Sequence, residues 1–330
     1  MRAALLYVVL FPFCQAAPHV VPDICKPVHE IAGSSAPVSS AVDTAAMETT
    51  ETPTETIIAT TLIQDEPEKV VSRQEDDVLA IFAAYSGAAY KVTNEWDCEY
   101  ACQYPGTEGT IIEYNWNIGF PPSAGYIARN PNSKTIITAF QGTEDQSQWL
   151  DNLDVALKPW PEAINGSKVH TGFLHGYLDV RDDVVNELKT IASKYLDYSI
   201  ALVGHSLGGA RAALCLLDLS ITTPELLPRM YLYTQGQPRT GNKEFANAID
   251  ALSVPKYREV YEYDIVPRIP PTFLGYAHHL TEVWIHNNET VLCVNPIDDN
   301  SCSGNGDLLH PLSILDHFRY PGLKYEISSN

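Results

Sequence analysis

Residues 199–219 join an apolar run, a glycine-rich turn and a helix-forming stretch, and this order constrains the fold more than any other feature. The run Ser199–Val203 is β-branched and aliphatic, as in a buried strand. The turn reads Gly204-His-Ser-Leu-Gly-Gly209, and Ala and Leu dominate the residues after it. Glycines flanking a serine allow a turn too tight for larger side chains and hold the hydroxyl above the sheet edge. The segment predicts a strand-turn-helix unit that presents Ser206 as a nucleophile.

The helix in this unit has a chemical consequence. The backbone N–H of Leu207 opens the helix and is expected to point at a developing oxyanion beside Ser206. The alternative is a glycine-rich turn without chemistry. The strand before it and the helix after it count against that alternative.

Short β-rich runs alternate with helical patterns along the rest of the chain. The expected strands are Lys134–Phe140, Ser199–Val203, Met230–Thr234, Tyr257–Tyr263 and Glu282–His286. The expected helices are Gly176–Tyr195, Leu207–Leu219 and Asn242–Leu252. This alternation predicts an α/β fold in which helices flank a mostly parallel central sheet.

A serine of ordinary pKa needs a base, and the base needs an orienting carboxylate. In a fold of this kind the three follow in the order Ser, acid, His. For the acid we favour Asp264, because it ends the run Tyr257–Tyr263 and precedes a proline-stiffened turn. Spacing alone leaves five candidates for the base: His278, His279, His286, His310 and His317.

The N-terminus has the composition of a secretory signal. Arg2 precedes an apolar run from Ala3 to Phe13, and Ala16 and Ala17 offer a cleavage site. The run is shorter than the roughly 18 residues that a membrane span needs. We expect residues 1–17 to be a signal peptide and the protein to be secreted; a buried N-terminal strand is the structural alternative.

Residues 18–73 look like a propeptide or a disordered leader. No Phe, Tyr or Trp occurs between Phe13 and Phe82, and residues 34–64 are rich in Ser and Thr without Lys or Arg. Such a stretch buries too little apolar area to offset its ordering entropy. Ser72 and Glu75 then form a capping box before a helical pattern, so we expect one folded domain over residues 74–330.

The net charge of the chain excludes some classes of binding partner. The 330-residue chain has 21 Lys plus Arg against 41 Asp plus Glu, a formal net charge of -20. Such acidity argues against nucleic acid and strongly anionic membranes. A neutral or interfacial substrate fits better.

Five of the seven cysteines lie beyond the leader. In an oxidising compartment Cys98 with Cys102, and Cys293 with Cys302, are near enough in sequence to close as local disulfides. Cys215 lies in an apolar helical pattern and is interpreted as a buried free thiol. The spacing of Cys98 and Cys102 is not that of a C-x-x-C redox motif, and a zinc site lacks a second ligand pair.

Several segments together resemble the secreted triacylglycerol lipases of filamentous fungi in the class 3 lipase family, which have the α/β-hydrolase fold. The resemblance runs from Ser72 to Gly322. It is carried by Val169-His-Thr-Gly-Phe-Leu174, Gly204-His-Ser-Leu-Gly-Gly209, Tyr233-Thr-Gln-Gly-Gln-Pro-Arg-Thr-Gly-Asn242, Asp264-Ile-Val-Pro267 with Pro270-Pro271, and Ile314-Leu-Asp-His-Phe-Arg-Tyr-Pro-Gly322.

The resemblance implies roles for several residues. It places the catalytic base on His317 and so completes a triad of Ser206, Asp264 and His317. It assigns a second oxyanion donor to Thr143, in the loop Gln141-Gly142-Thr143, through its backbone N–H and its hydroxyl. Without Ser206 the same loop would be interpreted as an ordinary turn at a strand end.

The resemblance also implies a short helical lid. Trp149, Leu150 and Leu153 would form one apolar face of a helix, the face that covers the serine in water and turns outward at an oil surface. A surface helix packed permanently on the core is the alternative. Two features depart from the family pattern: Gln141 stands where relatives commonly have Arg, and the segment 144–154 has no basic residue.

The serine motif predicts a secreted serine esterase that acts through an acyl-enzyme, and the resemblance implies that its substrates are acylglycerols at a lipid–water interface. We expect it to be a monomer and to need no metal and no cofactor. The rivals are a soluble carboxylesterase of the feruloyl-esterase type and an inert secreted binding protein. Sequons at Asn165 and Asn288 permit N-glycosylation.

Overall fold

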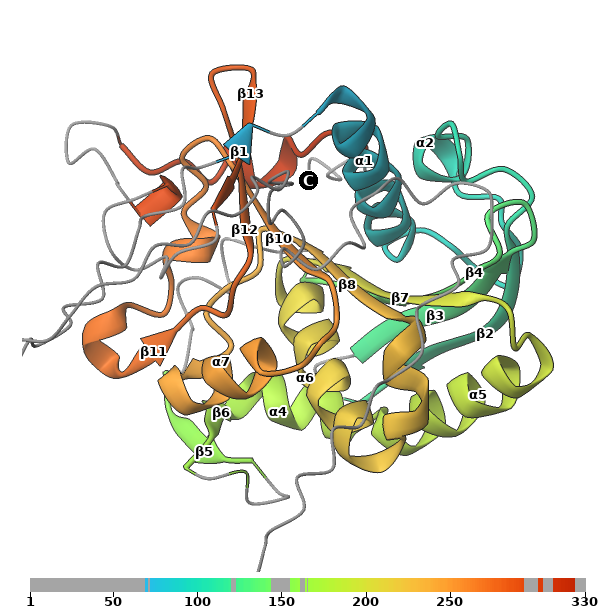
Figure 1. Cartoon of the computed structure of the whole chain (residues 1–330), viewed down its shortest axis with the longest axis horizontal. Helices are drawn as coiled ribbons and strands as arrows, with labels where there is room; N and C mark the ends of the chain where they lie inside the picture. Colours follow the sequence, from blue (N-terminus) through green and yellow to red (C-terminus); the bar gives the residue numbers. More distant parts are fainter. Residues whose placement is uncertain are drawn as a thin grey trace, which may run out of the picture.

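The computed structural model describes residues 69–70, 72–119, 123–143, 155–160, 164, 166–293, 302–304 and 311–323. Among them a nine-stranded sheet runs in the order β1-β13-β12-β10-β8-β7-β4-β3-β2 (Figure 1). Its strands are β1 (Lys69–Val70), β2 (Ile111–Ile118), β3 (Ser123–Asn130), β4 (Thr135–Phe140), β7 (Ser199–His205), β8 (Met230–Gln235), β10 (Lys256–Tyr261), β12 (Glu282–His286) and β13 (Glu289–Cys293).

The middle of the sheet is parallel and its borders are antiparallel. Strands β4, β7, β8, β10 and β12 pair in parallel, in the register Val203 with Tyr233 and Tyr257 with Tyr233. Antiparallel partners extend it at both ends: β3 and β2 beyond β4, and β13 and β1 beyond β12. The predicted fold class is confirmed, whereas the antiparallel borders were not predicted.

Helices cover both faces of this sheet (Figure 1). On one face lie α1 (Arg73–Ala88) and α2 (Glu99–Cys102); on the other lie α4 (Thr171–Leu178), α5 (Arg181–Lys194), α6 (Leu207–Thr222) and α7 (Lys243–Asp250). Strand β7 shows how one segment serves both layers. Ile200 and Leu202 pack toward α6, while Ala201 and Val203 face α1, because successive strand residues point to opposite faces.

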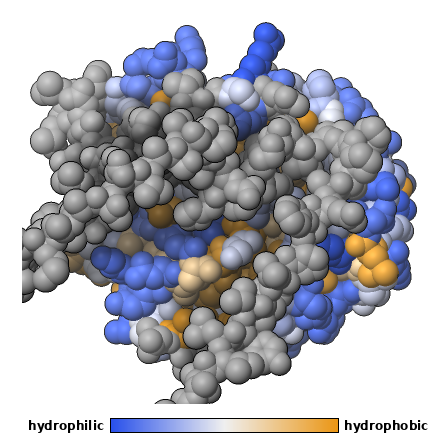
Figure 2. All heavy atoms as spheres, in the orientation of Figure 1, coloured by the Kyte–Doolittle hydropathy of each residue, from blue (hydrophilic) through white to orange (hydrophobic). Residues whose placement is uncertain are grey.

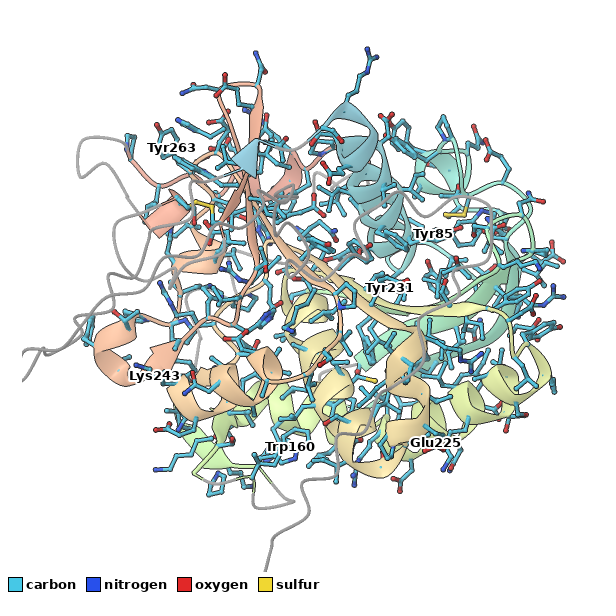
Figure 3. The ribbon with its side chains drawn as sticks, in the orientation of Figure 1. Tyr85, Trp160, Glu225, Tyr231, Lys243 and Tyr263 are labelled. Carbon is cyan, nitrogen blue, oxygen red and sulfur yellow. A yellow bond between two sulfur atoms is a disulfide. The ribbon has the colours of Figure 1, made fainter. Side chains whose placement is uncertain are left out.

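The two cores can be followed by their large side chains (Figure 3). Tyr85 of α1 is buried between that helix and the sheet, and Trp160 is buried on the other face, near β5 and α4. Hydrophilic side chains form most of the outer rim of the described surface in Figure 2. No helix of the described residues is long and apolar enough to cross a membrane.

A smaller antiparallel sheet lies beside the main one. It has the order β11-β9-β6-β5, from β5 (Leu157–Pro159), β6 (Lys168–His170), β9 (Gly241–Asn242) and β11 (Tyr276–Ala277). Short 3₁₀ turns complete the chain: η2 (Pro224–Arg229), η3 (Val266–Arg268), η4 (Thr272–Leu274), η5 (Cys302–Gly304) and η6 (Asp316–Phe318).

Most predicted elements are present with shifted ends, but one helix is corrected. The expected helix Gly176–Tyr195 is two helices, because α4 ends at Leu178 and α5 starts at Arg181. Val180 between them is 1 % exposed, and its N–H bonds to Tyr177 O in a tight turn. Burying this valine side chain favours the break over a continuous helix.

The capping box before α1 is present. Ser72 N donates to Glu75 Oε2 over 2.8 Å, and Glu75 N donates to Ser72 Oγ. Strand β1 also pairs with β13, so folded sequence begins earlier than residue 74. The predicted signal peptide, and the leader before residue 69, lie outside the described residues.

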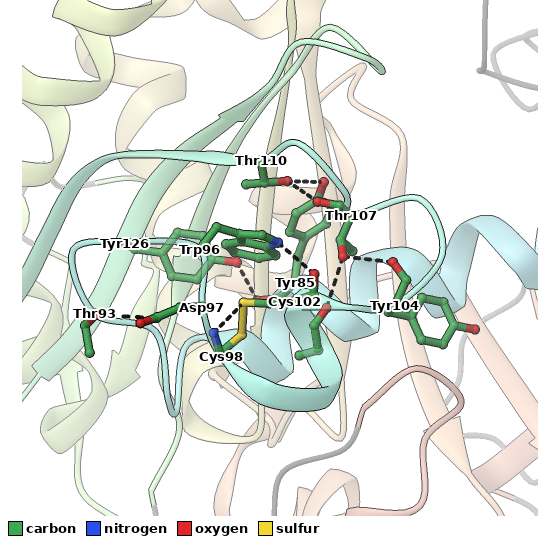
Figure 4. Close-up of a disulfide and its surroundings, with 11 residues drawn as sticks. Tyr85, Thr93, Trp96, Asp97, Cys98, Cys102, Tyr104, Thr107, Thr110 and Tyr126 are labelled. Carbon is green, nitrogen blue, oxygen red and sulfur yellow. Dashed lines mark hydrogen bonds between the residues drawn. A yellow bond between two sulfur atoms is a disulfide. The ribbon is translucent and has the colours of Figure 1, made fainter.

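Both local disulfides are formed, Cys98–Cys102 and Cys293–Cys302, and Cys215 is a buried free thiol. The first disulfide holds α2 against the loop before it (Figure 4). There Trp96 Nε1 donates to Cys102 O over 3.1 Å, and Trp96 packs edge-on against Tyr126 of β3. Of the two sequons, Asn288 is exposed in the β12–β13 turn, and Asn165 lies outside the described residues.

Glycines allow α6 to start against the sheet. A Cβ on Gly208 would lie 2.0 Å from Phe140 O, and a Cβ on Gly204 would lie 2.3 Å from the carbonyl carbon of Gly208. Both neighbours are backbone and cannot rotate away. The helix therefore meets the ends of β4 and β7 more closely than any other residue type allows.

We predict that Gly208→Ala lowers the free energy of unfolding by about 3 kcal/mol or more, the upper end of the range for overpacked sites, because the clash is with backbone. Gly172→Ala in α4 is the control, since its Cβ would meet only the His170 ring at 3.3 Å. Denaturant unfolding of the two variants measures the difference. Equal stabilities would show that the elbow can relax.

Candidate active site

Ser206 sits at the turn from β7 to α6 in a strained backbone conformation. Its φ is 59° and its ψ is -131°, a region that residues other than glycine rarely adopt. The turn is fixed because Ser206 N donates to Gln235 O over 2.8 Å, at the end of the neighbouring strand β8. The predicted strand-turn-helix unit is present, and Leu207 is the first residue of the helix.

The loop after β4 passes directly over this turn. A Cβ on Gly142 would lie 2.7 Å from His205 O and 3.1 Å from Ser206 Cβ, so only glycine fits there. Thr143, the candidate oxyanion residue, comes next and is half-buried. Phe140 and Gln141, which lead into this loop, also lie against Gly208, so the loop contacts both Ser206 and the first turn of α6.

Asp264 follows β10 and is fully buried. Its Oδ2 accepts hydrogen bonds from His317 Nδ1 at 2.8 Å and from Tyr320 Oη at 2.6 Å, and its Oδ1 accepts from Val266 N at 2.8 Å. These donors hold the carboxylate in one orientation. His317 is held with Nδ1 toward the acid. Its other ring nitrogen, Nε2, is buried and has no hydrogen-bond partner among the described residues.

The turn after β8 leaves room for this pair. Gly236 has a φ of 58°, and a Cβ there would lie 2.6 Å from His317 Cε1 and 2.9 Å from Asp264 Oδ2. Gln235 and Gly236 thus contact both parts of the site: the first binds the backbone of Ser206, and the second packs against His317 and Asp264. Ser206, Asp264 and His317 are each 0 % exposed.

His205 joins the nucleophile segment to the histidine segment. Its Nε2 donates to His317 O over 2.8 Å, and its Nδ1 accepts from Tyr90 Oη at 2.9 Å. Burial, reinforced by the nearby His317, holds the pKa of His205 well below its usual value. A neutral ring with its proton on Nε2 satisfies both bonds.

Only one of the five candidate histidines meets Asp264 within the described part of the chain. His278 Nε2 donates to Pro267 O, His279 pairs with Leu280 O and Gln237, and His286 contacts Glu262. Burial lowers the pKa of His279 to about 3. His310 lies outside the described residues, as do Trp149, Leu150 and Leu153 of the expected lid.

Sequence reasoning missed Tyr320, His205 and Gly236 as parts of the site. Tyr320 lies three residues after His317 in the segment that carries the resemblance, and this proximity is the signal that could have found it. The contacts of Gly236 involve β10 and the C-terminal segment, so no local pattern points to it.

One group of described side chains has the spacing of metal ligands: Glu282, Cys293 and Cys302. The two sulfurs are joined in a disulfide and are not available as thiolate ligands. Glu282 instead binds Arg258 Nη2 at 2.8 Å and Ser303 N at 2.9 Å. The cluster therefore ties η5 to the sheet.

Comparison with known proteins relates this chain to lipases. The model of the family "Lipase (class 3)" matches residues 137–274. The chain is 32% identical to a lipase of Rhizomucor miehei over 95% of its own length and 87% of that lipase, and 33% identical to a lipase of Rhizopus niveus over 69% of this chain and 57% of that one. A solved triacylglycerol lipase, whose catalytic centre is a serine protease triad, superposes with a TM-score of 0.73 at 33% identity, covering 78% of this chain and 99% of that chain.

The Tyr320 hydroxyl provides a prediction about stability. Tyr320→Phe removes a 2.6 Å donor from a fully buried carboxylate, so we expect a loss of about 1.5–3 kcal/mol in the free energy of unfolding. Tyr114→Phe on β2 is a control that is not in contact with Asp264. Chemical denaturation compares the two, and equal stabilities would mean that Asp264 does not depend on this bond.

Proposed function

The chain belongs to the class 3 lipase family, and from this premise we propose that it hydrolyses acylglycerol esters with Ser206 as the nucleophile, His317 as the base and Asp264 as its orienting acid. The observation that carries the proposal is the 2.8 Å bond from His317 Nδ1 to Asp264 Oδ2, buried beside the strained Ser206 turn. No other described histidine contacts Asp264.

The geometry supports the following course for the reaction. His317 Nε2 takes the proton of Ser206 as the hydroxyl oxygen attacks the ester carbonyl, and Asp264 stabilises the imidazolium that forms. The backbone N–H groups of Thr143 and Leu207, together with the Thr143 hydroxyl, stabilise the tetrahedral oxyanion. His317 then gives the proton to the leaving alcohol, and an acyl-enzyme remains. Water, activated by the same histidine, releases the fatty acid.

Two features of the site support stabilisation of the oxyanion by dipoles that are already in position. The α6 N-terminus lies beside Ser206, so the positive end of the helix dipole favours a negative oxygen there. The loop with Gly142 is attached to strand β3, because Gln141 N donates to Ala124 O over 2.9 Å. A donor that is fixed before the reaction costs little reorganisation during it.

The burial of Ser206 and His317 supports the proposal that a movable segment covers the site. Ser206 and His317 are 0 % exposed, so a substrate reaches them only after a segment moves. We propose that this segment is the lid with Trp149, Leu150 and Leu153, which lie outside the described residues. An oil surface would favour opening by burying the apolar face that water disfavours.

We further propose that the protein is secreted, with residues 1–17 as signal peptide and the following segment as a leader. Because Ser72 caps α1 and β1 pairs with β13, a cut that preserves these contacts falls before Lys69.

The triad is tested by single substitutions. We expect Ser206→Ala and His317→Ala each to lower kcat on a p-nitrophenyl ester by at least about 10³-fold, because the nucleophile and base act as a unit. Ser220→Ala in α6 and His175→Ala in α4 are matched controls and should keep most of the activity. Substantial turnover by Ser206→Ala would exclude this residue as the nucleophile.

The lid is tested by comparing dissolved and emulsified esters. Trp149→Asp should reduce several-fold the rise in activity that accompanies emulsification, while turnover of a short soluble ester stays near the wild-type rate, since only the apolar face is changed. Tyr100→Asp on α2 is the control, because it also replaces an aromatic side chain by a carboxylate but lies outside the lid. Smooth saturation through the aggregation limit in the wild type would favour a soluble esterase.

A further inference from the structure

A buried carboxyl beneath α1 takes no part in the reaction described above. Glu259 lies on β10 and is 0 % exposed. Its Oε1 accepts a 2.6 Å hydrogen bond from Gln235 Nε2 on the adjacent strand β8. Its other oxygen, Oε2, has no partner among the described residues. A carboxyl at such depth is stable when it is neutral and costly when it is charged.

No basic side chain among the described residues offsets a charge on Glu259. Asp76 faces it from α1, Tyr320 from the C-terminal segment, and Gln235 from β8; on β12 the residue paired with it is the apolar Val283. Burial raises the pKa of Glu259 to about 8, and the negative charge of Asp76 adds to the rise, although the bond from Gln235 opposes it. Glu259 is therefore mainly protonated at neutral pH.

Glu259 is coupled to the site through two consecutive residues. Gln235 binds it by the side chain and receives Ser206 N by the backbone carbonyl, over 2.8 Å. Gly236 N donates to Glu259 O over 3.0 Å, and Gly236 packs against the His317–Asp264 pair. A displacement of this turn would move the nucleophile relative to its base.

We propose that the neutral carboxyl of Glu259 is a positioning group for the Ser206 turn, and that its ionisation in alkaline solution loosens the Gln235–Gly236 turn and lowers turnover. The inference rests on the proposed role of Ser206. An ionised Glu259 has to be hydrated, because no basic side chain of the described residues compensates it. Helix α1 packs against β8, the strand that leads into the turn (Figure 1), so water that enters between them to hydrate Glu259 displaces the turn.

The direct test is the dependence of kcat on pH with a soluble ester. In the wild type kcat should fall about ten-fold between pH 7 and pH 9, following one ionisation near pH 8. Glu259→Gln keeps the shape and an acceptor for Gln235 but cannot ionise, so its kcat should stay nearly level over this range. KM should change little in both proteins. An identical alkaline fall in Glu259→Gln would overturn the proposal.

Asp76→Asn is the second variant and acts in the opposite direction. It removes the negative charge that disfavours ionisation of Glu259, so the alkaline fall should move to lower pH. The double variant with Glu259→Gln should lose this shift. A shift that persists in the double variant would assign the alkaline fall to another group.

A stability measurement tests the ionisation without catalysis. The pKa of Glu259 in the folded protein is about 8 against an ordinary value of 4.5, so the folded state holds a proton that the unfolded state releases between these limits. Stability from this group is complete below pH 4.5 and declines until pH 8. The Tm of Glu259→Gln should match the wild type near pH 4 and exceed it increasingly toward pH 8. A Tm difference that stays constant with pH would contradict the buried proton on Glu259. Activity in Ser206→Ala, in contrast, would refute only the assigned nucleophile.

Discussion

The close approach of α6 to the ends of β4 and β7 is the constraint on which the site depends. Gly208 lies against Phe140 O and Gly204 against Gly208, so the chain turns within a single residue, Ser206, at positive φ. Parallel strands place their carboxyl ends at one edge, so the loop after β4, the turn after β8 and the acid after β10 meet there. The strain at Ser206 is balanced by this packing.

A second constraint comes from the C-terminal segment. Tyr320 and Leu323 pack against Ala83 of α1, and a Cβ on Gly322 would lie 1.9 Å from Ala80 O. Hydrogen bonds then run from Tyr90 through His205 to His317, and both His317 and Tyr320 donate to Asp264. Helix α1 thus positions the histidine although it contributes neither nucleophile nor acid. This arrangement also explains why a buried group beneath α1, Glu259, can be coupled to the reaction.

Short-range sequence patterns predicted part of the fold and part of the site. The Ser206 turn, the five parallel strands and Asp264 follow from apolar runs, glycine positions and proline placement, which act within a few residues. Spacing leaves His317 as one of five candidates and only the resemblance selects it, because its segment reaches Asp264 through the packing of Tyr320 and Leu323 on Ala83 of α1. The antiparallel borders depend on which strands pair, and the break at Val180 depends on burial; periodicity records neither.

The central claim is that Ser206 carries the acyl group during turnover. Inactivation with diethyl p-nitrophenyl phosphate followed by peptide mapping tests it most directly, because the reagent transfers its phosphoryl group to an activated serine and leaves a stable mass. The account predicts one diethylphosphoryl group per chain, on Ser206, and no label when Asp264→Asn or His317→Ala is treated for the same time. A label on another residue, or inactivation without a label on Ser206, would contradict it.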